Sequence, residues 1–257
     1  MHTDYNEPKV LYFTNRNVLY VRIPEMDTEQ IPFYMKEMAK RKDKQIDRVV
    51  IDVRYNDGGS DNVWKSVLSA IIDEPVIYPT KVLFKNTPTV ISYFNTVRND
   101  TLSPTQKNDV IIGRDTLFYR YDIDTIAPAA NTLAYKGNIY VLADARCYSS
   151  TKAFTSICER MNRLISVGQS IGNFGGVGIN PFVFSLPYSK LIFRVGITLE
   201  GIDTSNIEDY YHDRMEIPVE ESIQEVIFKE NWTGECYGED YLFNHDPVFQ
   251  KVLEQKD

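Results

Sequence analysis

The segment Asn138–Phe154 constrains the fold more than any other part of the chain; its sequence is NIYVLADARCYSSTKAF. It begins with a continuous apolar run, Ile139–Ala143, which is typical of a buried strand. A short polar turn follows, and a helix is predicted to open at Ser149. Ser149 or Ser150 can serve simply as the N-cap of that helix. A serine at a helix N-terminus can also act as a nucleophile, because the unpaired first-turn N–H groups favour developing negative charge.

A second strand–helix pair precedes this segment in the chain. Arg48–Arg54 is an apolar strand of the type found in buried parallel sheets, and a helix is predicted after the polar turn that begins at Tyr55. Since both apolar strands lead into helices, we expect Val49–Val53 and Ile139–Leu142 to be neighbouring parallel strands. This alternation predicts an α/β architecture.

The remaining pattern predicts short elements around this core. Strands are expected at Val10–Phe13 and Val18–Ile23, and a helix at Thr28–Lys42, which has apolar residues at helical spacing. Phe182–Leu186 and Leu191–Thr198 are predicted to form an antiparallel pair. The last predicted elements are a short segment at Ile217–Val219 and a helix at Pro247–Glu254.

The segment Glu74–Tyr135 differs from the rest because it is polar and rich in proline. We predict that it forms hairpins and loops, less ordered than the core, and that it borders a groove above Ser149. The whole chain, 1–257, is therefore expected to be one core domain with an insert at about 74–135.

Composition limits the classes of function. The net charge of −8 argues against nucleic acid as a partner. The three cysteines have irregular spacing and predict neither a metal site nor a disulfide framework. No run is long and apolar enough to predict a membrane span, and the N-terminal residues have no signal-peptide pattern. The compartment is open: the protein is cytoplasmic, or an export signal lies upstream of this sequence.

Three segments resemble the tail-specific, or C-terminal processing, serine peptidases and their tricorn-like branch. Val49–Gly59 matches their D-x-R-x-N-x-G-G motif at the end of an apolar strand. Tyr140–Phe154 resembles their nucleophile segment, and Gly168–Gly176 resembles the Gly-rich loop that follows it. The resemblance implies a catalytic core of the ClpP/crotonase type, a stacked ββα superhelix, without a cofactor. No PDZ-like domain is recognised in the sequence.

The resemblance also implies roles for individual residues. Ser149 is the expected nucleophile, and the oxyanion hole is expected to combine the N–H of Ser150 with that of Gly58 or Gly59. The other interpretation of the glycine pair is a simple strand-to-helix turn. Glycine suits the proposed role, because the backbone must approach the substrate closely.

The general base is the part of the family pattern that this sequence lacks. The expected lysine is missing from Gly168–Gly176, and Arg22 stands near the place of the tricorn-like histidine, although arginine is too basic to accept a proton at neutral pH. Lys152, three residues after Ser149, and His212 are the substitute candidates. For each of them an exposed, solvated side chain is the competing interpretation.

Two functions therefore follow from the sequence. The first is a serine peptidase that cleaves peptides or unfolded proteins through an acyl-enzyme on Ser149. The alternative is a non-catalytic, peptide-binding relative that has lost its base. The family resemblance is compatible with a periplasmic or secreted protein, and the sequence leaves the oligomeric state open.

Overall fold

The computed structural model describes residues 6–85, 87–97, 110–112, 115–158, 161–170, 182–195, 198–200 and 215–255, which divide into two units. The first unit comprises Met1–Val76, Thr125–Gly172 and Asp213–Asp257. The second comprises Ile77–Asp124 and Asn173–His212. Among the described residues, no helix combines the length and apolar character needed to cross a bilayer.

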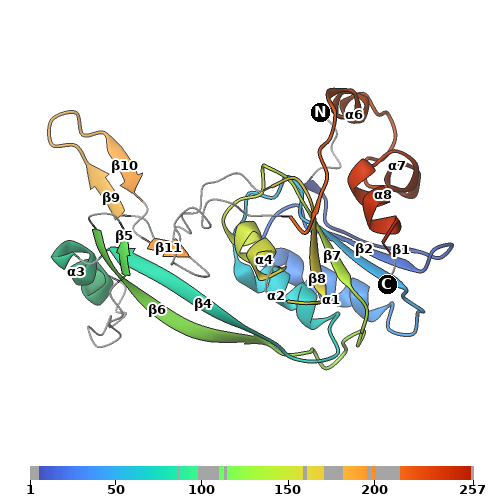
Figure 1. The fold of residues 1–257 in the computed structure, drawn as a ribbon, viewed down its shortest axis with the longest axis horizontal. Helices are drawn as coiled ribbons and strands as arrows, with labels where there is room; N and C mark the ends of the chain where they lie inside the picture. The colour runs from blue at the N-terminus through green and yellow to red at the C-terminus, as the bar shows by residue number, and fades with distance from the viewer. Residues whose placement is uncertain are drawn as a thin grey trace. The chain divides into compact units, whose positions relative to one another are not determined.

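A six-stranded sheet forms the centre of the first unit, in the order β1-β2-β3-β7-β8-β12 (Figure 1). Its strands are β1 (Lys9–Phe13), β2 (Val18–Arg22), β3 (Arg48–Asp52), β7 (Ile139–Ala143), β8 (Leu164–Gly168) and β12 (Ile217–Pro218). Strand β1 pairs antiparallel with β2, and every other neighbouring pair in this sheet is parallel. The unit is therefore a mixed α/β structure with a parallel sheet.

The predicted pairing of the two apolar strands is confirmed. Strands β3 and β7 are adjacent and parallel, with Val49 opposite Ile139 and Asp52 opposite Leu142. All five residues of β7 are buried, as are Val49–Asp52 of β3. Both strands lie in the middle of the sheet, where continuous apolar runs are needed because helices cover both faces.

Helices cover the two faces of this sheet separately (Figure 1). On one face lie α1 (Ile31–Ala39), α2 (Asp61–Ser69) and α4 (Ser150–Cys158), where Trp64 of α2 stacks on Phe154 of α4. On the other face lie α7 (Glu239–Asn244) and α8 (Pro247–Leu253), and α6 (Ile223–Glu230) precedes them. A buried cluster joins these C-terminal helices to the sheet through Tyr20, Tyr140 and Phe249.

The predicted helix at Thr28–Lys42 begins later than expected. A 3-10 turn at Thr28–Gln30 comes first, capped by the side chain of Asp27, and α1 then starts at Ile31. Pro32 explains the break, since proline has no N–H to donate and is favoured in the first turn of a helix.

The second unit contains a four-stranded sheet in the order β11-β4-β6-β5. These strands are β4 (Val76–Lys85), β5 (Val110–Ile112), β6 (Asp115–Ile126) and β11 (Thr198–Glu200). The helix α3 (Pro88–Val97) lies in a segment predicted to hold only hairpins and loops, so that expectation was incomplete. The predicted antiparallel pair is confirmed as β9 (Phe182–Ser185) and β10 (Ile192–Val195).

Candidate active site

The polar turns after β3 and β7 leave the same edge of the sheet and are bonded to each other. The Val53 N–H donates to the carbonyl of Leu142 (2.9 Å), and the Tyr148 N–H donates to the carbonyl of Asn56 (3.1 Å). The thiol of Cys147 donates to the carbonyl of Val53 (3.1 Å). These bonds extend the parallel pairing beyond the strands. The turn that carries the glycine pair and the turn that carries Ser149 are therefore held side by side.

Ser149 occupies a sharp turn between β7 and α4. Its φ of +56° lies in the left-handed region, which non-glycine residues rarely adopt. The residue is half-buried, and its carbonyl accepts the Ala153 N–H (3.0 Å) at the start of α4. A serine with strained backbone between a strand and a helix has the geometry of a nucleophile elbow.

The backbone of Gly58 packs directly against this turn. A Cβ atom added to Gly58 would lie 2.6 Å from the carbonyl oxygen of Tyr148, 2.7 Å from Cβ of Ser149 and 3.0 Å from the nitrogen of Ser150. The φ of Gly58 is +99°, also in the region that favours glycine. The structure thus brings together Gly58, Ser149 and Ser150, which the sequence analysis grouped from two distant segments.

The two glycines differ in what their N–H groups contact. The Gly58 N–H donates to Oδ1 of Asn56 (2.8 Å). Gly59 forms a parallel bridge with Met26, in which the neighbouring groups, the Gly58 carbonyl and the Ser60 N–H, bond to Met26 (3.0 and 2.8 Å). The Gly59 N–H therefore points away from Met26. Gly59 is exposed, and within the described residues its N–H has no acceptor.

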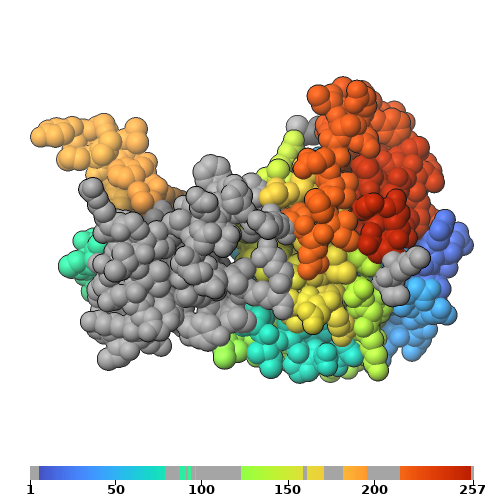
Figure 2. Space-filling view, viewed as in Figure 1, coloured from blue at the N-terminus to red at the C-terminus, as the bar shows by residue number. Residues whose placement is uncertain are grey.

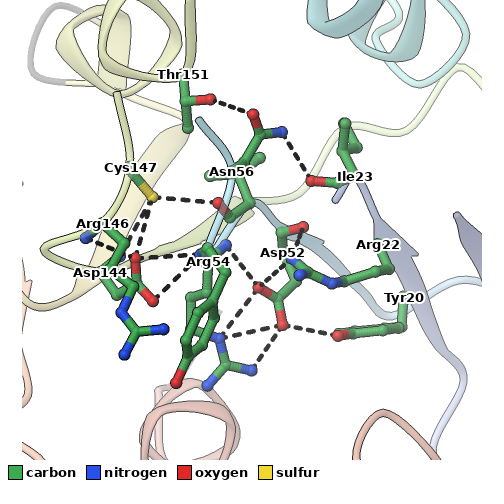
Figure 3. A network of polar contacts seen from close by, with 12 residues as sticks. Tyr20, Arg22, Ile23, Asp52, Arg54, Asn56, Asp144, Arg146, Cys147 and Thr151 are labelled. Atoms are coloured by element: carbon green, nitrogen blue, oxygen red, sulfur yellow. Dashed lines mark hydrogen bonds and ion pairs between the residues drawn. The ribbon is translucent and has the colours of Figure 1, made fainter. Parts of the chain in front are cut away.

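Asn56 ties three parts of the site together (Figure 3). Its Nδ2 donates to the carbonyl of Ile23 (2.9 Å), and its Oδ1 accepts both the Gly58 N–H and the hydroxyl of Thr151 (2.8 Å each). The side chain is fully buried. The sequence motif includes Asn56 but predicts no role for it; its position two residues before the glycine pair is the sequence signal for this contact.

The two adjacent serines also differ. Ser150 is buried, and its hydroxyl donates to Oδ1 of Asp61 (2.6 Å), which also accepts from Nε1 of Trp64 (3.2 Å). The Ser149 hydroxyl has no hydrogen-bond partner in the part of the chain that the structure describes. Ser150 thus anchors α4 to α2, whereas the Ser149 hydroxyl makes no such bond to a described residue.

A buried network of charges supports the end of β3 (Figure 3). The carboxylate of Asp52 accepts from Nη2 of Arg54 (2.6 Å), Nη1 of Arg22 (3.4 Å) and the hydroxyl of Tyr20 (2.7 Å). Arg54 also binds Asp246, the N-cap of α8 (2.7 Å). Burial alone would raise the pKa of Asp52, but Arg54 and Arg22 outweigh burial and hold that pKa well below its usual range.

Tyr55 links this network to the turn before Ser149. Its φ is +62°, and its N–H donates to both carboxylate oxygens of Asp144 (3.1 and 3.2 Å). The guanidinium of Arg146 lies 4.6 Å from the centre of the Tyr55 ring, and Nζ of Lys229 lies 4.9 Å from it. Burial, followed by repulsion from Arg54, lowers the pKa of Lys229.

Of the two candidate bases, Lys152 lies within the described residues and His212 does not. Lys152 is 9% exposed on α4, so its interpretation as an exposed, solvated side chain was wrong. His212 and residues 171–176 of the Gly-rich loop lie outside the described residues. Arg22 is fully buried and paired with Asp52, which leaves it no role as a proton acceptor.

Comparison with known protein families gives one match over most of the chain. The family model described as peptidase family S41 matches residues 17–201. This range includes β3, the glycine pair, Ser149 and α4, and it confirms the family resemblance that the motifs carry. Among curated proteins no match is found.

Solved structures share the fold at low sequence identity. A candidate peptidase from Parabacteroides merdae ATCC 43184 is 16% identical, with a TM-score of 0.59 over 86% of this chain and 59% of that one. A candidate S41 protease from Bacteroides fragilis NCTC 9343 is 11% identical, with a TM-score of 0.56 over 99% and 58%. A CPAF mutant is 15% identical, with a TM-score of 0.56 over 93% and 51%. The chain thus corresponds to between 51% and 59% of these longer structures.

Proposed function

Because the chain belongs to peptidase family S41, we propose that it is a serine peptidase that acts on peptides or unfolded proteins. The observation that carries the proposal is the contact of the Gly58 backbone with Ser149 and with the nitrogen of Ser150. A glycine turn and a helix N-terminus beside one strained serine support the proposal, because acyl transfer uses a nucleophile next to N–H groups that can stabilise an oxyanion.

In the proposed reaction, the Ser149 hydroxyl attacks the peptide carbonyl carbon and gives its proton to a base. The carbonyl becomes a tetrahedral oxyanion that accepts hydrogen bonds from the Ser150 N–H and the Gly59 N–H. We choose Gly59 rather than Gly58, because the Gly58 N–H already donates to Asn56. The C–N bond then breaks, the amine leaves with the proton, and water hydrolyses the ester on Ser149.

Two residues, Lys152 and His212, are the candidates for the base. Lys152 lies three residues after Ser149, and its burial supports a role inside the site. His212 is the second candidate. The alternative function is a peptide-binding relative without a base.

We infer a ClpP/crotonase-like ββα core, supported by the two successive strand–helix units β3–α2 and β7–α4. One core domain with an insert at 74–135 stays a prediction.

A fluorophosphonate probe tests the mechanism, since labelling requires an activated hydroxyl. The wild type should be labelled, and should cleave an unfolded protein substrate; Ser149→Ala should do neither. Ser156→Ala is the matched control, because it removes a hydroxyl from the same helix, one that donates only to the Ala153 carbonyl, and it should retain labelling. Lys152→Met should abolish turnover if Lys152 is the base. Labelling that persists in Ser149→Ala would refute the mechanism, and a folded wild type that is never labelled would favour the peptide-binding alternative.

A further inference from the structure

Tyr55 has a backbone conformation that its residue type rarely adopts. It stands between Arg54 and Asn56, in the turn that leads from β3 to the glycine pair. Its φ of +62° lies in the left-handed region, where a bulky side chain is an outlier. Such a conformation persists only where the surrounding contacts over-determine it, and strained residues of this kind cluster at functional sites. The contacts of Tyr55 therefore indicate what the strain maintains.

Two of these contacts come from the turn before Ser149. The carboxylate of Asp144 accepts the Tyr55 N–H at both oxygens (3.1 and 3.2 Å), and it also accepts the Arg146 N–H (3.0 Å). The Arg146 guanidinium lies 4.6 Å from the centre of the Tyr55 ring, within the range of a cation–π interaction. Asp144 and Arg146 thus hold Tyr55 at its backbone and at its ring.

The third contact comes from α6. This helix lies on the surface of the first unit (Figure 2, orange-red), and Lys229 is the one of its eight residues that is buried. Nζ of Lys229 lies 4.9 Å from the centre of the Tyr55 ring and has no hydrogen-bond acceptor among the described residues. A buried ammonium without an acceptor is costly, and the ring offsets part of that cost, because cation–π contacts strengthen when water is excluded. The ring therefore has two cationic neighbours from different segments.

The hydroxyl of Tyr55 is not suited to serve as the missing base. Burial, followed by the negative charge of Asp144, raises the pKa of this phenol above its ordinary value. The phenol therefore keeps its proton at neutral pH. The contacts described above are made by the ring and the backbone, so they direct attention to the position of Tyr55 rather than to its acidity.

Tyr55 is followed directly by Asn56, which organises the candidate active site. The Asn56 carbonyl accepts the Tyr148 N–H (3.1 Å), and its Oδ1 accepts the Gly58 N–H (2.8 Å). The peptide bond that joins Tyr55 to Asn56 is planar and stiff, so the orientation of Tyr55 constrains where Asn56 lies. A displacement of the Tyr55 ring would therefore be transmitted to both of these hydrogen bonds.

We propose that Tyr55 is a positioning residue of the candidate active site. The cationic groups of Arg146 and Lys229 hold its ring, and its backbone then fixes Asn56, which directs the glycine turn toward Ser149. Tyr55 acts through Asn56 and does not need to touch the substrate. For its effect on turnover the inference rests on the proposed peptidase function, whereas the position of Asn56 can be measured without activity.

Amide hydrogen exchange, resolved to single residues by NMR, reports the position of Asn56 through the Gly58 and Tyr148 N–H groups that bond to it. Tyr55→Leu removes the ring from both cations and should raise the two exchange rates at least about tenfold. Tyr55→Phe keeps the aromatic face and should hold both rates within about twofold of the wild type.

Arg146→Met keeps the experiment decisive if Tyr55→Leu does not fold, as judged by circular dichroism and melting temperature. Arg146 is exposed, and its loss should raise the two exchange rates about two- to fivefold, the factor that an exposed cation–π contact supplies. Lys44→Met is the matched control. Lys44 is also exposed and lies 5.8 Å from the centre of the Tyr12 ring, so its removal should change neither rate.

Turnover separates the positioning role from the proposed function. If the wild type cleaves an unfolded protein substrate, Tyr55→Leu should lower kcat at least about tenfold with little change in KM, and Tyr55→Phe should restore kcat. Unchanged turnover in Tyr55→Leu would overturn the inference. So would wild-type exchange rates in Tyr55→Leu, or in Arg146→Met where Tyr55→Leu does not fold. A Tyr55→Phe variant as impaired as Tyr55→Leu would assign the role to the hydroxyl and also overturn it. A wild type that the fluorophosphonate probe never labels, but whose variants show the expected exchange rates, would overturn the proposed function and leave the positioning of Asn56 supported.

Discussion

Asp246 offers a test of how the C-terminal helices support the candidate active site. Its side chain is 1% exposed and has two structural roles. It accepts the N–H groups of Val248 and Phe249 (3.0 Å each), as the N-cap of α8. It also accepts two hydrogen bonds from the Arg54 guanidinium (3.1 and 2.7 Å). Substitutions can separate these roles.

Asp246→Asn keeps an N-cap side chain but removes the charge, whereas Asp246→Ala removes both. Breaking a buried ion pair costs about 3–5 kcal/mol, and losing an N-cap typically costs about 1 kcal/mol. Arg54 still has Asp52 as a partner, so the lower end of the first range applies. We expect Asp246→Asn to lower the free energy of unfolding by about 3 kcal/mol, and Asp246→Ala by about 4 kcal/mol.

Urea unfolding followed by tryptophan fluorescence measures the free energy of unfolding of the first structural unit. The chain has two tryptophans, Trp64 and Trp232, and both belong to the first unit, as does Asp246. Asp240→Asn, an exposed acid in α7, is a suitable control and should stay within about 0.5 kcal/mol of the wild type. If Asp246→Asn were as stable as the wild type, the buried pair would contribute nothing net. Equal losses in the two Asp246 variants would exclude a role for the cap.

Two further predictions concern Gly58 and Lys229. Gly58→Ala should destabilise the fold by about 1–3 kcal/mol, because φ is +99° and the new Cβ would lie 2.7 Å from Cβ of Ser149. Any turnover should fall about 100-fold or more, because the new Cβ would displace Ser149 and Ser150. Wild-type stability and activity would contradict the packing at this turn. Lys229→Met should be as stable as the wild type or more stable near neutral pH, because burial lowers the pKa of Lys229. The unfolded lysine binds more protons than the folded one, so the wild type should gain on this variant as pH rises toward the ordinary lysine pKa near about 10.4. Urea midpoints at several pH values measure the difference in stability between the wild type and Lys229→Met. A difference that stays constant with pH would argue against the effect of burial on the pKa of Lys229.

Several features of the fold follow from local sequence alone. The apolar runs of β3 and β7, each followed by helix signals, were sufficient to predict two adjacent buried parallel strands. The resemblance of the motif ending in Gly58 and Gly59, and of the Ser149 segment, to the family pattern implied that these segments meet. Such inferences succeed because strand and helix periodicity, and the turn preference of glycine, depend on residues close together in the chain.

Local patterns were less informative where two structures were possible. The prolines of Glu74–Tyr135 suggested only hairpins and loops, although Pro88 begins α3. Proline is tolerated in the first turn of a helix as well as in loops, so its presence alone does not separate the two. The capping box of Ser222 and Glu225 at α6 is a sequence signal that could have located that helix.

The tertiary structure decided which atoms near Ser149 are available. Asn56 folds back onto Gly58, which leaves Gly59 as the glycine whose N–H is uncommitted among the described residues. The hydroxyl of Ser150 is held by Asp61, 89 residues earlier in the chain, and Arg54 is paired with Asp246, 192 residues later. Lys152 is buried by the packing of α4, although a lysine side chain by itself prefers solvent. Hydrogen-bond partners and burial of polar groups depend on residues that only the folded chain brings together, so they cannot be inferred from local periodicity.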